Sequence, residues 1–128
     1  MLKLYTDAAV RGNPGPATGG ALIIQAHKQI QLKTYLGTMN NHEAEFRAAI
    51  WAFTYLTENF STDEVVAFYA DSKLLIDSLT KHYAKHFASV LKQLLVLQSQ
   101  FTLVLNEWIP ERANGGAHSL ALSELQNY

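Results

Sequence analysis

Apolar and polar residues change their spacing along the chain, and the spacing predicts three strands in its first third. Residues 2–7 and 30–36 alternate between apolar and polar with a period of two, as half-buried strands do. Residues 20–26 are almost continuously apolar and predict a third strand. A turn of sequence Arg-Gly-Asn-Pro-Gly-Pro at residues 11–16 separates the first two. These segments predict an antiparallel meander.

Beyond residue 40 the period lengthens to three and four residues, which is typical of amphipathic helices. The predicted elements are a helix over 41–59, a strand over 65–70, helices over 72–79 and 83–97, a strand over 101–108, and a last helix ending near Leu125. The strand over 65–70 is apolar throughout, as expected for a strand buried on both faces.

The order β-β-β-α-β-α-α-β-α predicts an α/β fold with one five-stranded mixed sheet. Strands that are separated by helices connect through right-handed crossovers, so the first, fourth and fifth strands are expected to be parallel. The 128 residues fit a single domain over 1–128. Ligands of such sheets bind beyond the carboxyl ends of the strands.

The composition of the chain limits the kinds of site and partner that it can have. The chain has no cysteine, which excludes disulfides and thiolate metal sites. Its formal net charge of −1 provides no global basic field for a polyanion, so binding of nucleic acid would need a local patch and metal ions. The first residues do not read as a signal peptide, and no apolar run approaches the length of a membrane span. We therefore expect a cytoplasmic protein that has no contact with membranes.

Three carboxylates stand out. Asp7 and Asp71 close the first and fourth predicted strands, which are expected to be neighbours, and Glu45 lies in the first turn of the first helix. Asp71 could equally cap the helix that follows it. Two carboxylates about 4 Å apart repel by roughly 4 kcal/mol at an effective dielectric constant of 20, so such a cluster requires protonation or a cation. Oxygen ligands of this kind suit Mg²⁺ or Mn²⁺.

Four segments together resemble one known family, type 1 ribonuclease H. They are residues 5–20 (Tyr-Thr-Asp-Ala-Ala and Gly-Asn-Pro-Gly-Pro), 40–46 (Asn-Asn-His-Glu-Ala-Glu-Phe), 69–72 (Tyr-Ala-Asp-Ser) and 108–121. The resemblance covers nearly the whole chain in the family's order. It implies an endonuclease that hydrolyses the RNA strand of RNA/DNA hybrids with two divalent ions, Mg²⁺ or Mn²⁺.

The resemblance also implies roles for individual residues. Asp7 would bridge the two ions, with Asp71 beside it and Glu45 on the side of the leaving group. Gly12, Asn13, Asn40, Asn41 and His42 would contact the substrate, and Asn13, Asn41 and His42 would read the 2′-hydroxyls that distinguish RNA from DNA. Asn40 stands where many members carry a phosphate-binding threonine.

The chain departs from the family at three places. His118 occupies the position of the fourth metal-binding acid, and we expect it to complete the catalytic and metal-ligating set. The loop before it lacks a histidine that some members use for product release, and Arg112 is the nearest substitute. The basic, tryptophan-rich insertion of some members is absent. Basic residues near that position, expected on a helix face, are Lys81, His82, Lys85 and His86.

Two functions from different classes remain open at this stage. The first is the metal-dependent ribonuclease H, expected to be a monomer that binds RNA/DNA hybrid, with no protein partner indicated. The second is a non-catalytic binding or interaction module that has kept the fold after its metal site decayed. His118 favours the second function, whereas the intact carboxylates Asp7, Glu45 and Asp71 favour the first.

Overall fold

The computed structural model of the protein describes residues 1–128. In chain order the elements are β1 (Leu2–Val10), β2 (Gly15–Gln25), β3 (Lys28–Met39), α1 (Asn41–Asn59), β4 (Val65–Ala70), α2 (Lys73–Lys81), α3 (Ala88–Gln98), β5 (Leu103–Trp108), a single 3-10 turn (Glu111–Ala113) and α4 (Gly115–Leu125). The predicted order of strands and helices is confirmed. No helix combines the length and the apolar character that crossing a bilayer requires.

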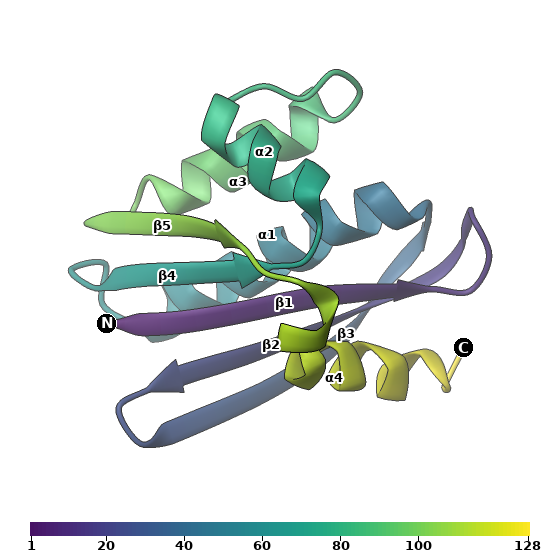
Figure 1. Ribbon diagram of the computed structural model, residues 1–128, viewed down its shortest axis with the longest axis horizontal. Coiled ribbons are helices and arrows are strands. Elements are labelled where there is room, and N and C mark those ends of the chain that lie inside the picture. Colours follow the sequence, from purple (N-terminus) through teal and green to yellow (C-terminus); the bar gives the residue numbers. More distant parts are fainter.

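The five strands form one mixed sheet in the order β3-β2-β1-β4-β5 (Figure 1). Strands β1, β2 and β3 pair antiparallel, whereas β4 pairs parallel with both β1 and β5. This is the α/β arrangement that the sequence predicts. Helix α1 lies on one face of the sheet together with α2 and α3, and α4 lies on the other (Figure 1).

The main core fills the space between the sheet and α1. Phe46 and Phe53 of α1 are fully buried with Leu4 of β1 and Phe68 of β4. The rings of Phe53 and Phe68 meet edge to face, with their centroids 5.2 Å apart. Burial of each such side chain contributes about 1.5–3 kcal/mol. This packing fixes α1 against β1, which carries Asp7, and against β4, which Asp71 follows.

Several predicted boundaries are wrong, and the largest error concerns the region before α3. The predicted helix over 83–97 begins only at Ala88, and Tyr83 is 65% exposed instead of buried. Lys81 is the last residue of α2, and its neighbour His82 has a left-handed backbone conformation that ends the helix. The expected basic helix face therefore does not exist: His82, Lys85 and His86 lie in the connection between α2 and α3.

The meander strands are longer than predicted. Strand β1 continues past Asp7 to Val10, because residues 8–10 still pair with β2 beyond the point where β4 ends. Strand β2 begins within the glycine- and proline-rich segment, at Gly15. Gly12 in the turn has a φ of 93°, a conformation that glycine adopts without strain.

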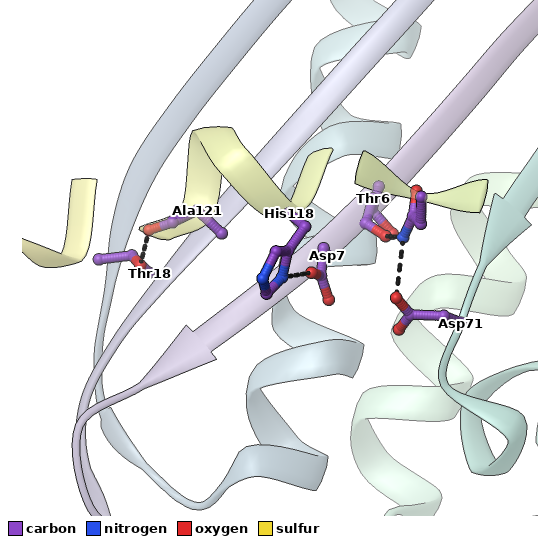
Figure 2. Close-up of polar contacts among 7 residues, drawn as sticks. Thr6, Asp7, Thr18, Asp71, His118 and Ala121 are labelled. Atoms are coloured by element: carbon purple, nitrogen blue, oxygen red, sulfur yellow. Dashed lines mark hydrogen bonds and ion pairs between the residues drawn. The ribbon is translucent and has the colours of Figure 1, made fainter. Parts of the chain in front are cut away.

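Two adjacent glycines of β2 allow helices to approach both faces of the sheet. A Cβ atom on Gly19 would contact Ala48 and Trp51 of α1, at 3.3 and 3.5 Å. A Cβ atom on Gly20 would overlap the backbone of α4, including the nitrogen of Ala121 at 2.7 Å. The hydroxyl of Thr18 donates a 2.7 Å hydrogen bond to the Ala121 carbonyl (Figure 2). Helix α4 therefore lies almost directly on the β2 backbone.

We predict that Gly20→Ala destabilises the fold by about 1–3 kcal/mol, because the added methyl group forces α4 away from β2. Chemical denaturation at neutral pH measures the change. Gly115→Ala is the matched control, because a Cβ atom at Gly115 meets nothing within 4 Å. Equal stability of Gly20→Ala and the wild type would contradict this account of the packing.

Candidate active site

The two aspartates lie where β1 and β4 separate. Parallel pairing of these strands ends at Thr6 and Ala70, so the next residue of each chain segment is an aspartate. Asp7 remains in β1 and is 4% exposed, whereas Asp71 follows the end of β4 and is partly buried. The register of a single strand pair thus places Asp7 and Asp71 side by side.

Glu45 completes the cluster from the opposite layer. It is the fifth residue of α1, in the second turn of the helix and not the first as predicted. Asp7, Glu45 and Asp71 each offer one carboxylate oxygen, and these oxygens all lie within 4.8 Å of one another. A β-strand, a helix and a strand end therefore meet at one point.

The burial and crowding of these carboxylates raise their pKa values. Burial, and then the charge of Asp71, raise the pKa of Asp7 from 3.8 to about 6, although a hydrogen bond with His118 opposes the shift. Burial, and then the charges of Asp7 and Asp71, raise the pKa of Glu45 well above its usual value. Burial also raises the pKa of Asp71, while the hydrogen bond from Asn114 lowers it. In the absence of a cation, the cluster therefore favours binding of protons.

His118 reaches the cluster through Asp7. It lies in the first turns of α4, and its Nδ1 is 2.8 Å from Asp7 Oδ2 (Figure 2). With the proton on Nδ1, the ring donates a hydrogen bond to the carboxylate. His118 is not among the three side chains whose ligand atoms gather within 4.8 Å. The expectation that it ligates a metal ion itself stays a prediction.

Asn114 joins three parts of the site, a function that the sequence did not reveal. Its buried Nδ2 donates to the Thr6 carbonyl at 2.8 Å and to Asp71 Oδ2 at 3.3 Å. Its own carbonyl accepts from the backbone nitrogen of His118 at 3.1 Å. The side-chain Oδ1 is buried without a protein partner. One residue thereby links β1 next to Asp7, Asp71 after the end of β4, and the start of α4.

A cleft of about 560 Å³ opens beside the carboxylates. Its walls include six of the predicted residues, which are Gly12, Asn13, Asn41, His42, Glu45 and Asp71. Asn13 Oδ1 accepts a 3.1 Å hydrogen bond from the backbone nitrogen of Asn41, so the β1–β2 turn is tied to the start of α1. Predicted substrate-binding residues that are 28 positions apart in the sequence therefore lie together.

Two predicted site residues lie elsewhere. Asn40 caps α1, accepting a 2.8 Å hydrogen bond from the Glu43 nitrogen, and it lines a separate hollow with Arg47 and His86. Arg112 is exposed in the 3-10 turn and does not line the cleft. Exposed polar residues of loops have few fixed neighbours, so spacing alone could not have located them.

Sequence reasoning also missed a lysine beside the cleft. Lys73, the first residue of α2, lines it, and its Nζ lies 5.9 Å from the centre of the Trp108 ring. Trp108 Nε1 donates a 3.1 Å hydrogen bond to the carbonyl of Asp71. The position of Lys73, two residues after Asp71 at the start of a helix, was the available signal.

The donor set fits a small divalent cation. Three converging carboxylates provide only oxygen ligands, which Mg²⁺ and Mn²⁺ prefer, and a bound cation would offset the mutual repulsion that helps to raise the pKa values of Asp7 and Glu45. The residues that could hold the ions are Asp7, Glu45 and Asp71.

Comparison with known proteins identifies the family of this chain. A sequence model of the RNase H family matches residues 1–114. The chain belongs to the RNase H family. The RNase H domain is 37% identical over its whole length to EbsB of Enterococcus faecalis, covering 96% of that protein. It is 33% identical to a ribonuclease H of Trichodesmium erythraeum, over 67% of the chain and 52% of that protein.

Solved structures support the same assignment. The N-terminal RNase H domain of Rv2228c from Mycobacterium tuberculosis matches with a TM-score of 0.89 at 29% identity, covering 98% of this chain and 94% of that one. LC11-RNase H1, solved in complex with an RNA/DNA hybrid, matches with a TM-score of 0.86 at 23% identity, over 98% of this chain and 99% of that one. The second similarity shows the fold alone.

The raised pKa of Asp7 predicts how the stability of the metal-free RNase H domain depends on pH. A carboxyl group whose pKa rises on folding takes up protons on folding, so the free energy of unfolding falls as pH increases from about 4 through about 6. Asp7→Asn removes this titration and should lessen the fall by on the order of 2 kcal/mol. Denaturant unfolding in EDTA at about pH 4.5 and about pH 7.5 measures it.

Asp63→Asn is the matched control, because Asp63 is exposed and outside the cluster. An identical pH dependence in wild type and Asp7→Asn would contradict the charge crowding inferred for the site.

Proposed function

We propose that this RNase H domain is an endonuclease that hydrolyses the RNA strand of RNA/DNA hybrids with the help of divalent ions. The observation that carries the proposal is the convergence of Asp7, Glu45 and Asp71 within 4.8 Å, in a chain of the RNase H family. The hybrid complex of LC11-RNase H1, a protein of the same fold, supports hybrid as the substrate.

Asp7, Glu45 and Asp71 would hold Mg²⁺ or Mn²⁺, and the bound ions would supply an activated water and stabilise the leaving oxygen. The protein positions these ligands in advance. The end of β1–β4 pairing places the aspartates, Asn114 restrains Asp71, and His118 restrains Asp7. Because the carboxylates bind protons in the same pH range, ion binding should weaken as the pH falls.

The cleft provides a surface for the substrate. Asn13, Asn41 and His42 expose side chains that can donate and accept hydrogen bonds, as recognition of a 2′-hydroxyl requires. Lys73 adds a positive charge close to the carboxylates. Asn40, with its Oδ1 engaged at the start of α1, retains its amide donors for a phosphate in the separate hollow that it lines. Arg112 is proposed as a further contact of the substrate backbone.

Cleavage of a labelled RNA/DNA hybrid tests the proposal. We expect cleavage with Mg²⁺ or Mn²⁺ and none in EDTA, and Asp7→Asn should lose more than about 90% of the rate, a barrier increase above about 1.4 kcal/mol. Asp63→Asn should retain wild-type activity. Absence of cleavage with either metal would overturn the proposal in favour of a non-catalytic binding module.

The choice of substrate tests the contacts in the cleft. Hybrid should be cut far better than duplex DNA, and Asn41→Ala should weaken hybrid binding, because the 2′-hydroxyls are present only in RNA. Equal cleavage of duplex DNA would contradict the assignment of Asn13 and Asn41.

The metal preference tests His118. A neutral imidazole in place of a carboxylate removes one negative charge, and Mn²⁺ accepts nitrogen ligands more readily than Mg²⁺ does. Activity should therefore be higher with Mn²⁺, and His118→Asp should narrow the difference by improving the Mg²⁺ reaction. Calorimetric titration of each metal into wild type, His118→Asp and His118→Ala provides a second readout. Identical Mn²⁺/Mg²⁺ ratios in all three proteins would show that His118 does not ligate the ion.

A further inference from the structure

The two edge strands of the sheet, β3 and β5, are protected to different degrees against pairing with a further strand. On one side β3 is long, carries Lys28 and Lys33, and has an irregular register against β2. Charged residues and irregular pairing of this kind prevent an edge from accepting another strand. On the other side β5 has regular pairing with β4, no proline or lysine, and one charged residue, Glu107. Leu103 and Leu105 are 49% and 41% exposed there.

The backbone of β5 offers unpaired hydrogen-bonding groups at this edge. In a parallel pair, alternate residues of one strand direct both N–H and C=O to the neighbour. The nitrogen of Ile109 donates to the Ala70 carbonyl at 3.0 Å, so the odd-numbered residues of β5 face β4. The backbone groups of Val104 and Asn106 therefore point away from the sheet, where no further strand is present.

A groove of about 550 Å³ runs beside these groups, between β5 and the helices α2 and α3. In Figure 1, α2 and the more distant α3 both lie on the side of β5 that faces away from β4. A pair of amide hydrogen bonds of 2.8 and 3.2 Å between Gln98 and Asn106 holds α3 against β5. The groove therefore has one wall that can form backbone hydrogen bonds and one helical wall fixed in place.

The chemistry of the groove specifies its occupant. Half of its twelve lining residues are hydrophobic, among them Leu79, Val96 and Phe101. The ionisable side chains in the lining are Lys92 and His82, and the lining itself contains no carboxylate. An added strand would direct alternate side chains toward this apolar lining and toward the exposed face of Leu103 and Leu105. Apolar side chains and a carboxylate would thus complement the groove.

We propose that the groove along β5 binds an extended segment of another protein, apolar at most positions and carrying an acidic residue, which adds to the sheet as a sixth strand. This mode of recognition uses main-chain hydrogen bonds for affinity and side-chain pockets for specificity. The groove shares no lining residue with the catalytic cleft, so a bound segment leaves that cleft open. The site would tether the enzyme to a partner while it acts on its substrate.

A second copy of this chain complements the groove less well. In a symmetric contact both copies present the same patch. Lys92 and His82 would then be present on both sides, without a carboxylate in either lining. An acidic segment neutralises this charge, which is the reason for preferring a different protein.

The test is an NMR titration of the ¹⁵N-labelled full chain with the synthetic peptide acetyl-Glu-Val-Thr-Val-Leu-Val-amide. We expect saturable shifts of amide signals in residues 102–107 and 92–99, with a dissociation constant below about 1 mM. A peptide N-methylated at its central residues should bind at least about fivefold more weakly, because it cannot pair with the edge.

Reversing the charge at Lys92 tests whether the groove prefers a segment with an acidic residue. Lys92→Glu should weaken binding of the acidic peptide and strengthen binding of the same peptide with lysine in place of glutamate, while hybrid cleavage stays at the wild-type rate. Absence of saturable shifts, equal binding of the N-methylated peptide, or shifts confined to the cleft around Asn13 and Asn41 would overturn the proposal. So would concentration-dependent dimerisation through β5 in light scattering, which would identify a second copy as the occupant. The outcomes for peptide binding and dimerisation do not depend on whether the chain cleaves RNA.

Discussion

The site depends on the point at which β4 leaves β1. Their parallel ladder ends at Thr6 and Ala70, and the next residue on each side is an aspartate. Asp7 stays in its strand because β2 continues to pair with it, and its carboxylate is therefore held in place with little exposure. Repulsion between such close charges is large in a partly dry environment. The fold holds the carboxylates together through packing that is remote from them, chiefly the aromatic core between α1 and β4.

Helix α4 also holds residues of the site in place, and its position depends on the absence of a side chain at Gly20 of β2. Gly20 has no side chain, so the backbone of α4 approaches the strand and brings His118 to Asp7. Asn114, at the start of the same helix, links the Thr6 carbonyl to Asp71. The buried Oδ1 of Asn114 has no hydrogen-bond partner among the protein atoms. Gly20 and Asn114 together therefore set the position of α4 relative to both aspartates.

The site and the β5 groove also differ in the forces that would act on a ligand. The cleft beside Asp7, Glu45 and Asp71 is lined by carboxylates, amides and a lysine, and favours cations and polar ligands. The groove is half hydrophobic and borders an open strand edge, and favours an extended apolar segment. Because β5 pairs only with β4, its outer edge has no strand partner, whereas the candidate active site lies where the pairing of β1 and β4 ends.

The amino-acid sequence by itself determined the order of strands and helices, the family and the three carboxylates, because periodicity and short motifs are local properties. It also placed Asn13 and Asn41 in the site through their motifs. Only the tertiary structure decided that Asp7 lies within a continuing strand, that the segment before Ala88 is not helical, and that Asn114 and Lys73 border the carboxylates. It likewise paired His118 with Asp7, at a separation of 111 residues. Such contacts depend on strand register and on the close approach of α4 to Gly20, and neither can be deduced from the spacing of residues along one chain.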